Sequence, residues 1–239
     1  METPDILLED DALVALDKPA GMAAAECGRL LPAPVRPGAA LALVHRVDAE
    51  ASGAALFARD REALGYVSGQ FQSKTAETVL IALCVVDPAS PPPPEFSVEL
   101  AMGEDRAAPG RMRAFGRRGG EPAATRFRVL ESFGRYAWIE CRPLSGRRHQ
   151  VRVHLAAQKA PVLGDALYGD PQSVLLLSSL KRRYKGRDEE RPLVRRLALH
   201  LALLRFNHPR SRLPAEVASP VPADLGLALK YLRKFGGGL

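Results

Sequence analysis

Short runs of apolar residues alternate with polar ones along much of the chain, a pattern typical of β-strands joined by turns. The stretch 6–17 predicts two short strands around an acidic turn. Residues 61–71 instead carry Leu64, Val67 and Phe71 at helical spacing, which predicts a helix. Further strands are predicted at 41–48, 54–58, 79–86, 126–131, 136–142 and 197–206. The pattern therefore predicts an α+β fold with a mainly antiparallel sheet.

The segment 146–161 allows two interpretations. Residues 149–155 alternate like a strand, but an alanine-rich continuation follows and reaches Lys159. We favour a helix, in which Arg148 and Arg152 would share one face because they lie four positions apart.

Length and composition bound the class of protein. The chain has 239 residues, of which 46% are hydrophobic and 26% charged, the balance of a soluble globular protein. Five prolines within 88–94 predict a loop or a hinge between lobes. No apolar run approaches the roughly 18 residues of a membrane span. The acidic N-terminus, 1–5, lacks the layout of a signal peptide, so we expect a cytoplasmic protein.

Residues that could bind a metal ion are scattered. Cys27, Cys84 and Cys141 form no C-x-x-C pair and are odd in number, which argues against a disulfide framework and a zinc site. The histidines show no H-x-x-x-H spacing. The acidic triples 9–11 and 188–190 would be needed for a metal-dependent nuclease, but their surroundings are typical of solvated loops. We therefore expect no metal.

Charge is unevenly distributed along the chain. The formal net charge is +7 and the sequence pI is about 9.6. Residues 105–152 contain twelve arginines, no lysine and four acidic residues, so this window carries +8 and the rest of the chain −1. This segregation favours a polyanionic partner, and arginine suits bidentate contacts to phosphate. The alternative is a charged face that serves solubility alone.

Asp48 is the acidic residue whose surroundings best suit chemistry. It ends an apolar run, follows Arg46 by two positions and precedes the small-residue turn 51–53. On a strand, residues two apart face the same side, so Arg46 would keep Asp48 ionised and able to act as a nucleophile or base. The alternative is an ordinary surface ion pair. The chain has neither a glycine-rich phosphate loop nor a G-x-S-x-G elbow, which disfavours nucleotide-dependent chemistry and serine hydrolysis.

Four blocks of sequence together resemble the pseudouridine synthases of the RluA type. Residues 44–53, VHRVDAEASG, are similar to the family's H-R-L-D-x-x-T-S-G motif. The blocks DKPAG at 17–21 and SGRRHQVRVHL at 145–155, the latter continued by GDALYG at 164–169, agree in order and spacing. The last block, RLALH followed by FNHP, occupies 196–209.

The resemblance implies the pseudouridine synthase catalytic fold, with a mixed, mainly antiparallel central sheet and flanking helices. It implies an isomerase that converts uridine to pseudouridine in ribosomal or transfer RNA without cofactor, metal or energy source. Asp48 matches the nucleophile, Arg46 an arginine that helps to hold the flipped site open, and Arg152 the arginine that pairs with the nucleophile. Because strand-like sequence begins at Ile6, we expect one domain over 1–239, without a separate N-terminal RNA-binding domain. We expect a monomer with no membrane partner.

The RNA-binding residues are expected in the matched blocks and in the arginine-rich window, where such enzymes carry a loop that grips RNA. They are Lys18, His45, Arg111, Arg113, Arg117, Arg118, Arg147, Arg148, His149 and Gln150.

One position departs from the family pattern in a way that bears on activity. The family carries a tyrosine in the strand after the helix, and Leu80, 32 residues beyond Asp48, occupies that position. Leucine can pack against a base but has no hydroxyl and no aromatic face. Two hypotheses follow. The chain is an RNA pseudouridine synthase, or it is a catalytically weak or inactive RNA-binding or ribosome-assembly protein on the same fold. The presence of Asp48, Arg46 and Arg152 together favours the synthase.

Overall fold

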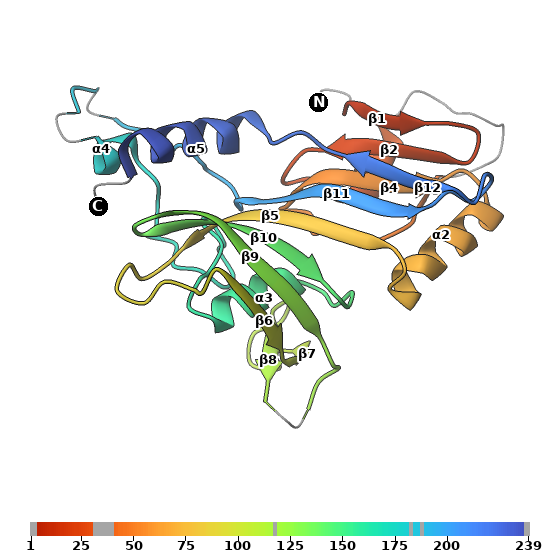
Figure 1. Ribbon diagram of the computed structural model, residues 1–239, viewed down its shortest axis with the longest axis horizontal. Coiled ribbons are helices and arrows are strands. Elements are labelled where there is room, and N and C mark those ends of the chain that lie inside the picture. Colours follow the sequence, from red (N-terminus) through yellow and green to blue (C-terminus); the bar gives the residue numbers. More distant parts are fainter. Residues whose placement is uncertain (1–3, 31–40, 117–118, 182–183, 187–188, 237–239) are drawn as a thin grey trace.

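The computed structural model describes residues 4–30, 41–116, 119–181, 184–186 and 189–236 (Figure 1). Its strands are β1 Ile6–Glu9, β2 Leu13–Lys18, β3 Ala42–Leu43, β4 Ser52–Ala58, β5 Glu77–Val85, β6 Glu95–Glu99, β7 Ala101–Glu104, β8 Met112–Phe115, β9 Ala124–Phe133, β10 Tyr136–Pro143, β11 Leu199–Asn207 and β12 Pro214–Ala218. Its helices are α1 Ala24–Arg29, α2 Arg61–Ser73, α3 Gln150–Ala157, α4 Leu177–Leu180 and α5 Ala223–Phe235.

One large sheet organises the molecule. Within the described residues it has ten strands, in the order β1-β2-β4-β11-β5-β10-β9-β6, with β12 added to β11 and β3 to β4. In this described sheet β4 and β11 pair in parallel and all other neighbours are antiparallel. A separate hairpin, β7–β8, projects beyond β6 and β9 (Figure 1). The predicted α+β fold with a mixed, mainly antiparallel sheet is confirmed.

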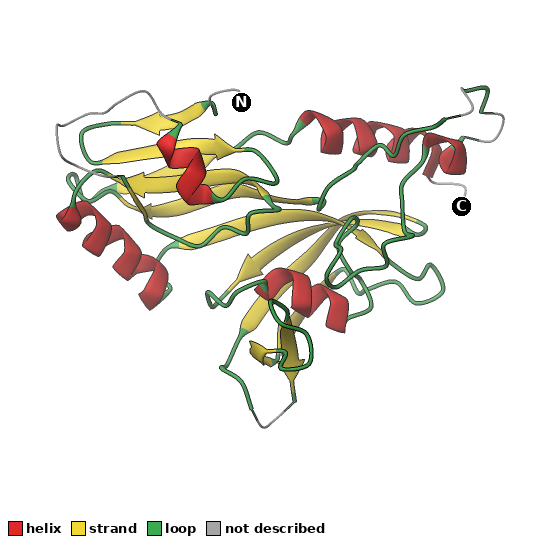
Figure 2. Ribbon diagram, turned by 180° about the vertical axis from the view of Figure 1, so that it is seen from behind, coloured by secondary structure: helices red, strands yellow, loops and turns green. Residues whose placement is uncertain are grey.

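Helices cover parts of the sheet, as expected. Helix α1 packs on β2, α2 on β4 and β11, and α3 on β9 and β10 (Figure 2). Strand β4 is buried along its whole length, because it lies between β2 and β11 and both of its faces are covered. Its run of seven buried residues, SGAALFA, therefore shows no alternation between apolar and polar positions.

Local sequence determines where helix α2 and strand β4, which closely follow Asp48 in the chain, begin and end. Helix α2 begins where the Asp60 side chain accepts the N–H of Ala63 at 2.9 Å, and it ends at Lys74, whose φ of 63° is left-handed. At the start of β4, Gly53 has a φ of 114° and passes so close to the backbone of Leu201 that a Cβ atom would collide with it. Only glycine fits this position, which brings β4 against β11 directly after the Asp48 loop.

The predicted strand 41–48 is largely wrong. Only Ala42–Leu43 pairs as a strand, and residues 44–51 form a loop. The side chain of His45 explains where the pairing ends. Its Nε2 accepts the N–H of Leu56 on β4 at 3.2 Å, in place of a carbonyl from a continuing strand. The apolar sequence pattern thus extends beyond Leu43, where the hydrogen-bonded strand pairing ends.

The helix predicted after residue 149 is confirmed as α3, but its predicted arginine face is not. His149 has a left-handed φ of 55°, so the helix starts at Gln150. Arg148 lies in the turn before the helix and is exposed, whereas Arg152 is 2% exposed. The two residues do not share a helical face, because His149 lies between them in the left-handed conformation and the helix begins only after it.

Two further observations concern the described ranges alone. None of their helices combines the length and the apolar character needed to cross a bilayer. The three cysteines are free and buried.

Candidate active site

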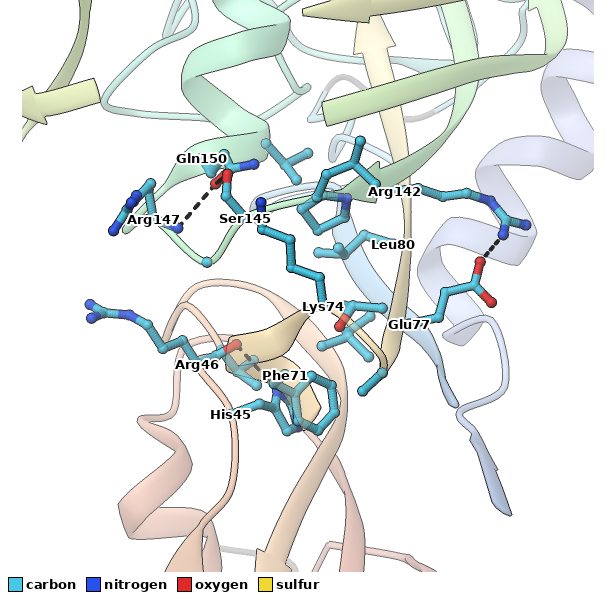
Figure 3. Close-up of a pocket in the computed structure, with 18 of the residues that line it drawn as sticks. His45, Arg46, Phe71, Lys74, Glu77, Leu80, Arg142, Ser145, Arg147 and Gln150 are labelled. Atoms are coloured by element: carbon cyan, nitrogen blue, oxygen red, sulfur yellow. Dashed lines mark hydrogen bonds and ion pairs between the residues drawn. The ribbon is translucent and has the colours of Figure 1, made fainter. Parts of the chain in front are cut away.

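A pocket of about 710 Å³ lies where the loop 44–51, the beginning of β5 and the start of α3 meet (Figure 3). All four sequence blocks identified above contribute to its lining or to its support. The lining includes His45, Arg46 and Asp48 from one block and residues 145–151 from another.

Asp48 presents its carboxylate to this pocket from a turn. The backbone carbonyl of Asp48 accepts the N–H of Ala51 at 3.2 Å, which closes the turn. Its Oδ2 lies 3.6 Å from Nη1 of Arg152, and the two side chains are 22% and 2% exposed. The predicted pairing of Arg152 with Asp48 is confirmed. The carboxylate is accessible, while the cation beside it is buried.

Arg152 is held from its other edge by Asp165. Its Nε and Nη2 each donate to a carboxylate oxygen of Asp165 at 2.8 Å. Burial raises the pKa of Asp165, but the hydrogen bonds and charge of Arg152, with the N–H groups of Leu167 and Tyr168, hold it below its usual range. The buried carboxylate thereby fixes the guanidinium so that Nη1 faces Asp48.

Arg46 does not take the predicted position beside Asp48. Among the residues that the structure describes, it forms no ion pair, and its exposed side chain extends away from Leu80 (Figure 3). The two-residue alternation used for the prediction holds only on a strand, and residues 44–51 form a loop. The cation beside Asp48 is Arg152 instead.

Lys18 lies beneath the Asp48 loop and is completely buried. Its Nζ donates to the carbonyls of Pro19 and Met22 at 2.9 Å, of Ala49 at 3.0 Å, and of Ala51. Burial lowers its pKa to about 8. This contradicts the prediction that Lys18 contacts RNA, because no surface of the side chain is available. Lys18 instead ties the loop that carries Asp48 to the turn after β2.

Gln150 holds the loop before α3 and has no free amide group for RNA. Its Oε1 accepts from Ser145 Oγ at 2.8 Å and from the Arg147 N–H at 3.0 Å. Its Nε2 donates to the carbonyl of Ala124 at 2.8 Å and to Thr125 Oγ1 at 3.0 Å. The amide's hydrogen-bonding capacity is used inside the protein, which contradicts direct RNA binding through this group.

The other arginines expected to bind RNA occupy different places. Arg147 and Arg148 line the pocket, the former paired with Glu121 and the latter exposed. Arg111 directly precedes β8 and Arg113 belongs to it, and neither residue lines the pocket. Their guanidinium carbons lie 5.5 Å and 4.5 Å from the ring centres of Tyr168 and Phe115. Arg117 and Arg118 fall outside the described residues.

The wall opposite the polar residues is apolar and includes Leu80. This side chain is half-buried, lines the pocket and packs in one apolar cluster with Phe71 and Ala76. The ring of Phe71 lies 5.4 Å from that of His45, which completes the wall (Figure 3). Burial lowers the pKa of His45 to about 4, so its imidazole is neutral at pH 7. Leu80 thus lies in the pocket, where the resemblance predicted a tyrosine.

Sequence reasoning missed four residues that complete the site. Asp165 and Tyr168 belong to the GDALYG block, which carried a signal but no assigned role. Lys74 and Arg126 line the pocket as exposed cations and form no ion pair among the described residues. The Lys74 side chain points into the pocket, toward the loop that carries Ser145 (Figure 3). No spacing rule links either cation to Asp48.

An accessible carboxylate beside a buried arginine, in a pocket lined by further cations, suits covalent chemistry on a polyanionic substrate. The particular family follows from the sequence. The chain belongs to the RNA pseudouridylate synthase family, whose sequence model matches residues 12–157.

Individual relatives agree with this family. The chain is 32% identical to ribosomal large subunit pseudouridine synthase C of Vibrio vulnificus, over 95% of this chain and 69% of the relative. It is 35% identical to the chloroplastic RNA pseudouridine synthase 2 of Arabidopsis thaliana, over 85% of this chain but about half, 48%, of that protein. Among solved structures, human RNA pseudouridylate synthase domain containing 4 superposes with a TM-score of 0.71 at 26% identity, covering 95% of this chain and 92% of that one.

Proposed function

We propose that this chain isomerises uridine to pseudouridine in RNA, with Asp48 as the nucleophile. The observation that carries the proposal is the ion pair between Asp48 and the buried Arg152, at the wall of a 710 Å³ pocket. A pocket of this size can admit one extruded nucleoside. Membership of the family supports the same reaction.

The reaction balances without an external oxidant, reductant or cofactor. The Asp48 carboxylate attacks the target nucleoside, the bond between C1′ and N1 breaks, and its electron pair leaves with the uracil. The uracil rotates, C5 bonds to C1′, and the bond between the Asp48 oxygen and C1′ breaks, which returns the carboxylate. C5 then loses its proton and N1 gains one, so the product is an isomer of the substrate. In this scheme the Arg152 guanidinium lies beside the Asp48 carboxylate and pairs with its charge before attack.

Extrusion of the base costs a few kcal/mol, which contacts to the RNA backbone must offset. Four cations that line the pocket have no ion-pair partner among the described residues, and we assign the phosphate contacts nearest the base to them. They are Arg46, Lys74, Arg126 and Arg148. Arg111 and Arg113 are proposed to contact RNA farther from the pocket, and Arg147 at its edge. Arg117 and Arg118, which lie outside the described residues, are also proposed to bind RNA.

Ribosomal RNA is the substrate we propose, because several relatives are named as ribosomal large subunit synthases. Transfer RNA is the alternative, and the two are separated by mapping. We further propose that residues 1–239 act as a monomer, in the cytoplasm, as a single catalytic domain.

Leu80 favours a second candidate, an RNA-binding or ribosome-assembly protein with little or no turnover. It lies in the pocket but offers neither a hydroxyl nor an aromatic face to the base. This candidate predicts RNA binding without any isomer of uridine.

Mapping pseudouridine across total RNA separates the two candidates. We expect at least one site to disappear when the gene is deleted and to return with the wild-type gene. The Asp48→Asn variant should not restore it, because the amide is not a nucleophile. If no site depends on the gene, or if Asp48→Asn restores full modification, the proposed activity is wrong.

A further inference from the structure

Two imidazole rings line the pocket, and their hydrogen bonds differ. Both nitrogens of His45 face backbone groups, the N–H of Leu56 at 3.2 Å and the carbonyl of Arg46 at 3.3 Å. His149 has one hydrogen bond, between its Nδ1 and the side-chain hydroxyl of Tyr168 at 2.8 Å. Within the described part of the chain, its Nε2 has no hydrogen-bond partner. Because His149 is 7% exposed and lines the pocket, this nitrogen is available to a group that enters it.

The Tyr168 hydroxyl links His149 to the backbone of β8. Its oxygen accepts the N–H of Met112 at 2.8 Å, and we assign its own proton to the hydrogen bond with Nδ1 of His149, which lies 2.8 Å away. Burial lowers the pKa of His149, so the ring is neutral at pH 7 and carries one proton. With Nδ1 as the acceptor, this proton is on Nε2. His149 therefore presents an N–H donor to the pocket.

The donor is held by the same carboxylate that fixes Arg152. Asp165 Oδ1 accepts the N–H of Tyr168 at 3.1 Å, and the guanidinium carbon of Arg152 lies 5.2 Å from the centre of the tyrosine ring. His149 itself has a left-handed φ of 55° at the N-terminus of α3. A non-glycine residue in this conformation is uncommon, and such strain is found most often at functional sites.

We propose that Nε2–H of His149 donates a hydrogen bond to a carbonyl oxygen of the target uracil as the bond between C1′ and N1 breaks. The inference rests on the proposed function. The electron pair of that bond passes to the uracil, whose negative charge spreads over N1, O2 and O4. A hydrogen bond to O2 or O4 is stronger in this anion than in the neutral base, so it stabilises the departing uracil. No proton is transferred, and the anion then bonds to C1′ through C5.

This role specifies the RNA contact that the sequence resemblance suggested for His149: it is made to the base and not to a phosphate. A neutral ring whose Nδ1 is occupied carries no charge with which to attract a phosphate. A neutral histidine near the N-terminus of a helix can instead polarise a substrate carbonyl. The assignment also gives the pocket one fixed polar contact to the base opposite the apolar Leu80 wall.

Two amide substitutions at residue 149 form a matched pair. The glutamine nitrogen can reach the place of Nε2, whereas the asparagine nitrogen reaches only that of Nδ1. Asparagine also tolerates the left-handed backbone. We expect His149→Asn to lower the single-turnover rate about 100-fold, the effect of losing one oxyanion donor. His149→Gln should stay within about tenfold of wild type. The rate is followed by tritium release from C5 of uridine, and the Kd for RNA by filter binding.

Tyr168→Phe provides a second test that leaves residue 149 unchanged. Without the hydroxyl, Nδ1 loses its proton donor and the ring can change tautomer, so we expect a smaller fall, about tenfold, at unchanged Kd. The inference is overturned if His149→Asn keeps the wild-type single-turnover rate or if His149→Asn and His149→Gln lower that rate equally. It is also overturned if His149→Asn weakens RNA binding, measured as Kd, without lowering the rate. A wild-type protein that forms no pseudouridine would overturn the proposed function instead.

Discussion

The two walls of the pocket differ in what holds them together. The polar wall, formed by Asp48 and His149 with Arg152 behind them, is a chain of hydrogen bonds and ion pairs that leads back to Asp165. The apolar wall around Leu80 is held by packing against Phe71 and Ala76. A substitution in the polar wall leaves a buried partner unsatisfied, whereas one among Leu80, Phe71 and Ala76 changes mainly the shape of the apolar wall.

This difference explains how the chain can carry Leu80 in place of a tyrosine and still keep Asp48 in position. Among the described residues, no hydrogen bond that fixes Asp48, Arg152 or His149 passes through the apolar wall. The geometry around the carboxylate is therefore independent of residue 80. Substitutions in the two walls should have separable effects.

The largest expected effect is that of Arg152→Met. Removal of the guanidinium leaves Asp165 buried without its cation, which should lower the free energy of unfolding by about 3–5 kcal/mol. Pseudouridine formation should fall by about a thousandfold or more, because Asp48 loses its cation as well. Denaturant unfolding and single-turnover rates measure the two effects.

Arg148→Met is the matched control for Arg152. Arg148 is exposed, so its loss should change the free energy of unfolding by less than about 0.5 kcal/mol and weaken RNA binding only. Equal stability of the two variants would mean that Arg152 does not hold the polar wall.

His45 predicts a pH dependence of stability in the apolar wall. Its pKa is lowered from 6.5 to about 4, so the unfolded chain takes up a proton at a higher pH than the folded protein. The stability from neutral His45 is complete above pH 6.5 and is lost as the pH falls toward 4, by roughly 3 kcal/mol in total.

His45→Gln keeps an acceptor for the Leu56 N–H and cannot be protonated. We expect its unfolding free energy to fall less steeply than that of wild type between pH 6.5 and 4. Parallel curves for the two proteins would show that His45 is protonated in the folded state.

The smallest expected effect is a gain at residue 80. Leu80→Tyr should raise the single-turnover rate about tenfold, because an aromatic ring stacks on uracil and its hydroxyl can assist proton removal. Leu80→Phe supplies the ring without the hydroxyl and separates these contributions. If neither variant is faster than wild type, residue 80 does not contact the base during the reaction.

Much of the fold could be predicted because its strands and helix α2 follow local patterns of hydrophobicity. The ion pair between Arg152 and Asp48 was predicted through the sequence blocks, since it joins residues far apart in the chain. The pairing of Arg46 with Asp48 was wrong, because it assumed a strand that the His45 side chain ends early.

Lys18 and Gln150 show what local sequence could not indicate. Both are polar residues in recognisable blocks and suited RNA binding by residue type. Their actual partners are backbone groups that the fold brings together, such as the Ala49 carbonyl for Lys18 and the Ala124 carbonyl for Gln150. Only the tertiary structure shows that these side chains have no capacity left for a ligand.

The most direct test of the central claim compares two carboxylates that face Arg152. Asp48 Oδ2 and Glu50 Oε2 lie 3.6 Å and 3.5 Å from its Nη1. With purified protein and RNA carrying the mapped uridine, Asp48→Asn should form no pseudouridine in a single turnover, while Glu50→Gln should stay within about tenfold of wild type. Product formation by Asp48→Asn, or equal loss in both variants, would contradict the assignment of Asp48 as the nucleophile.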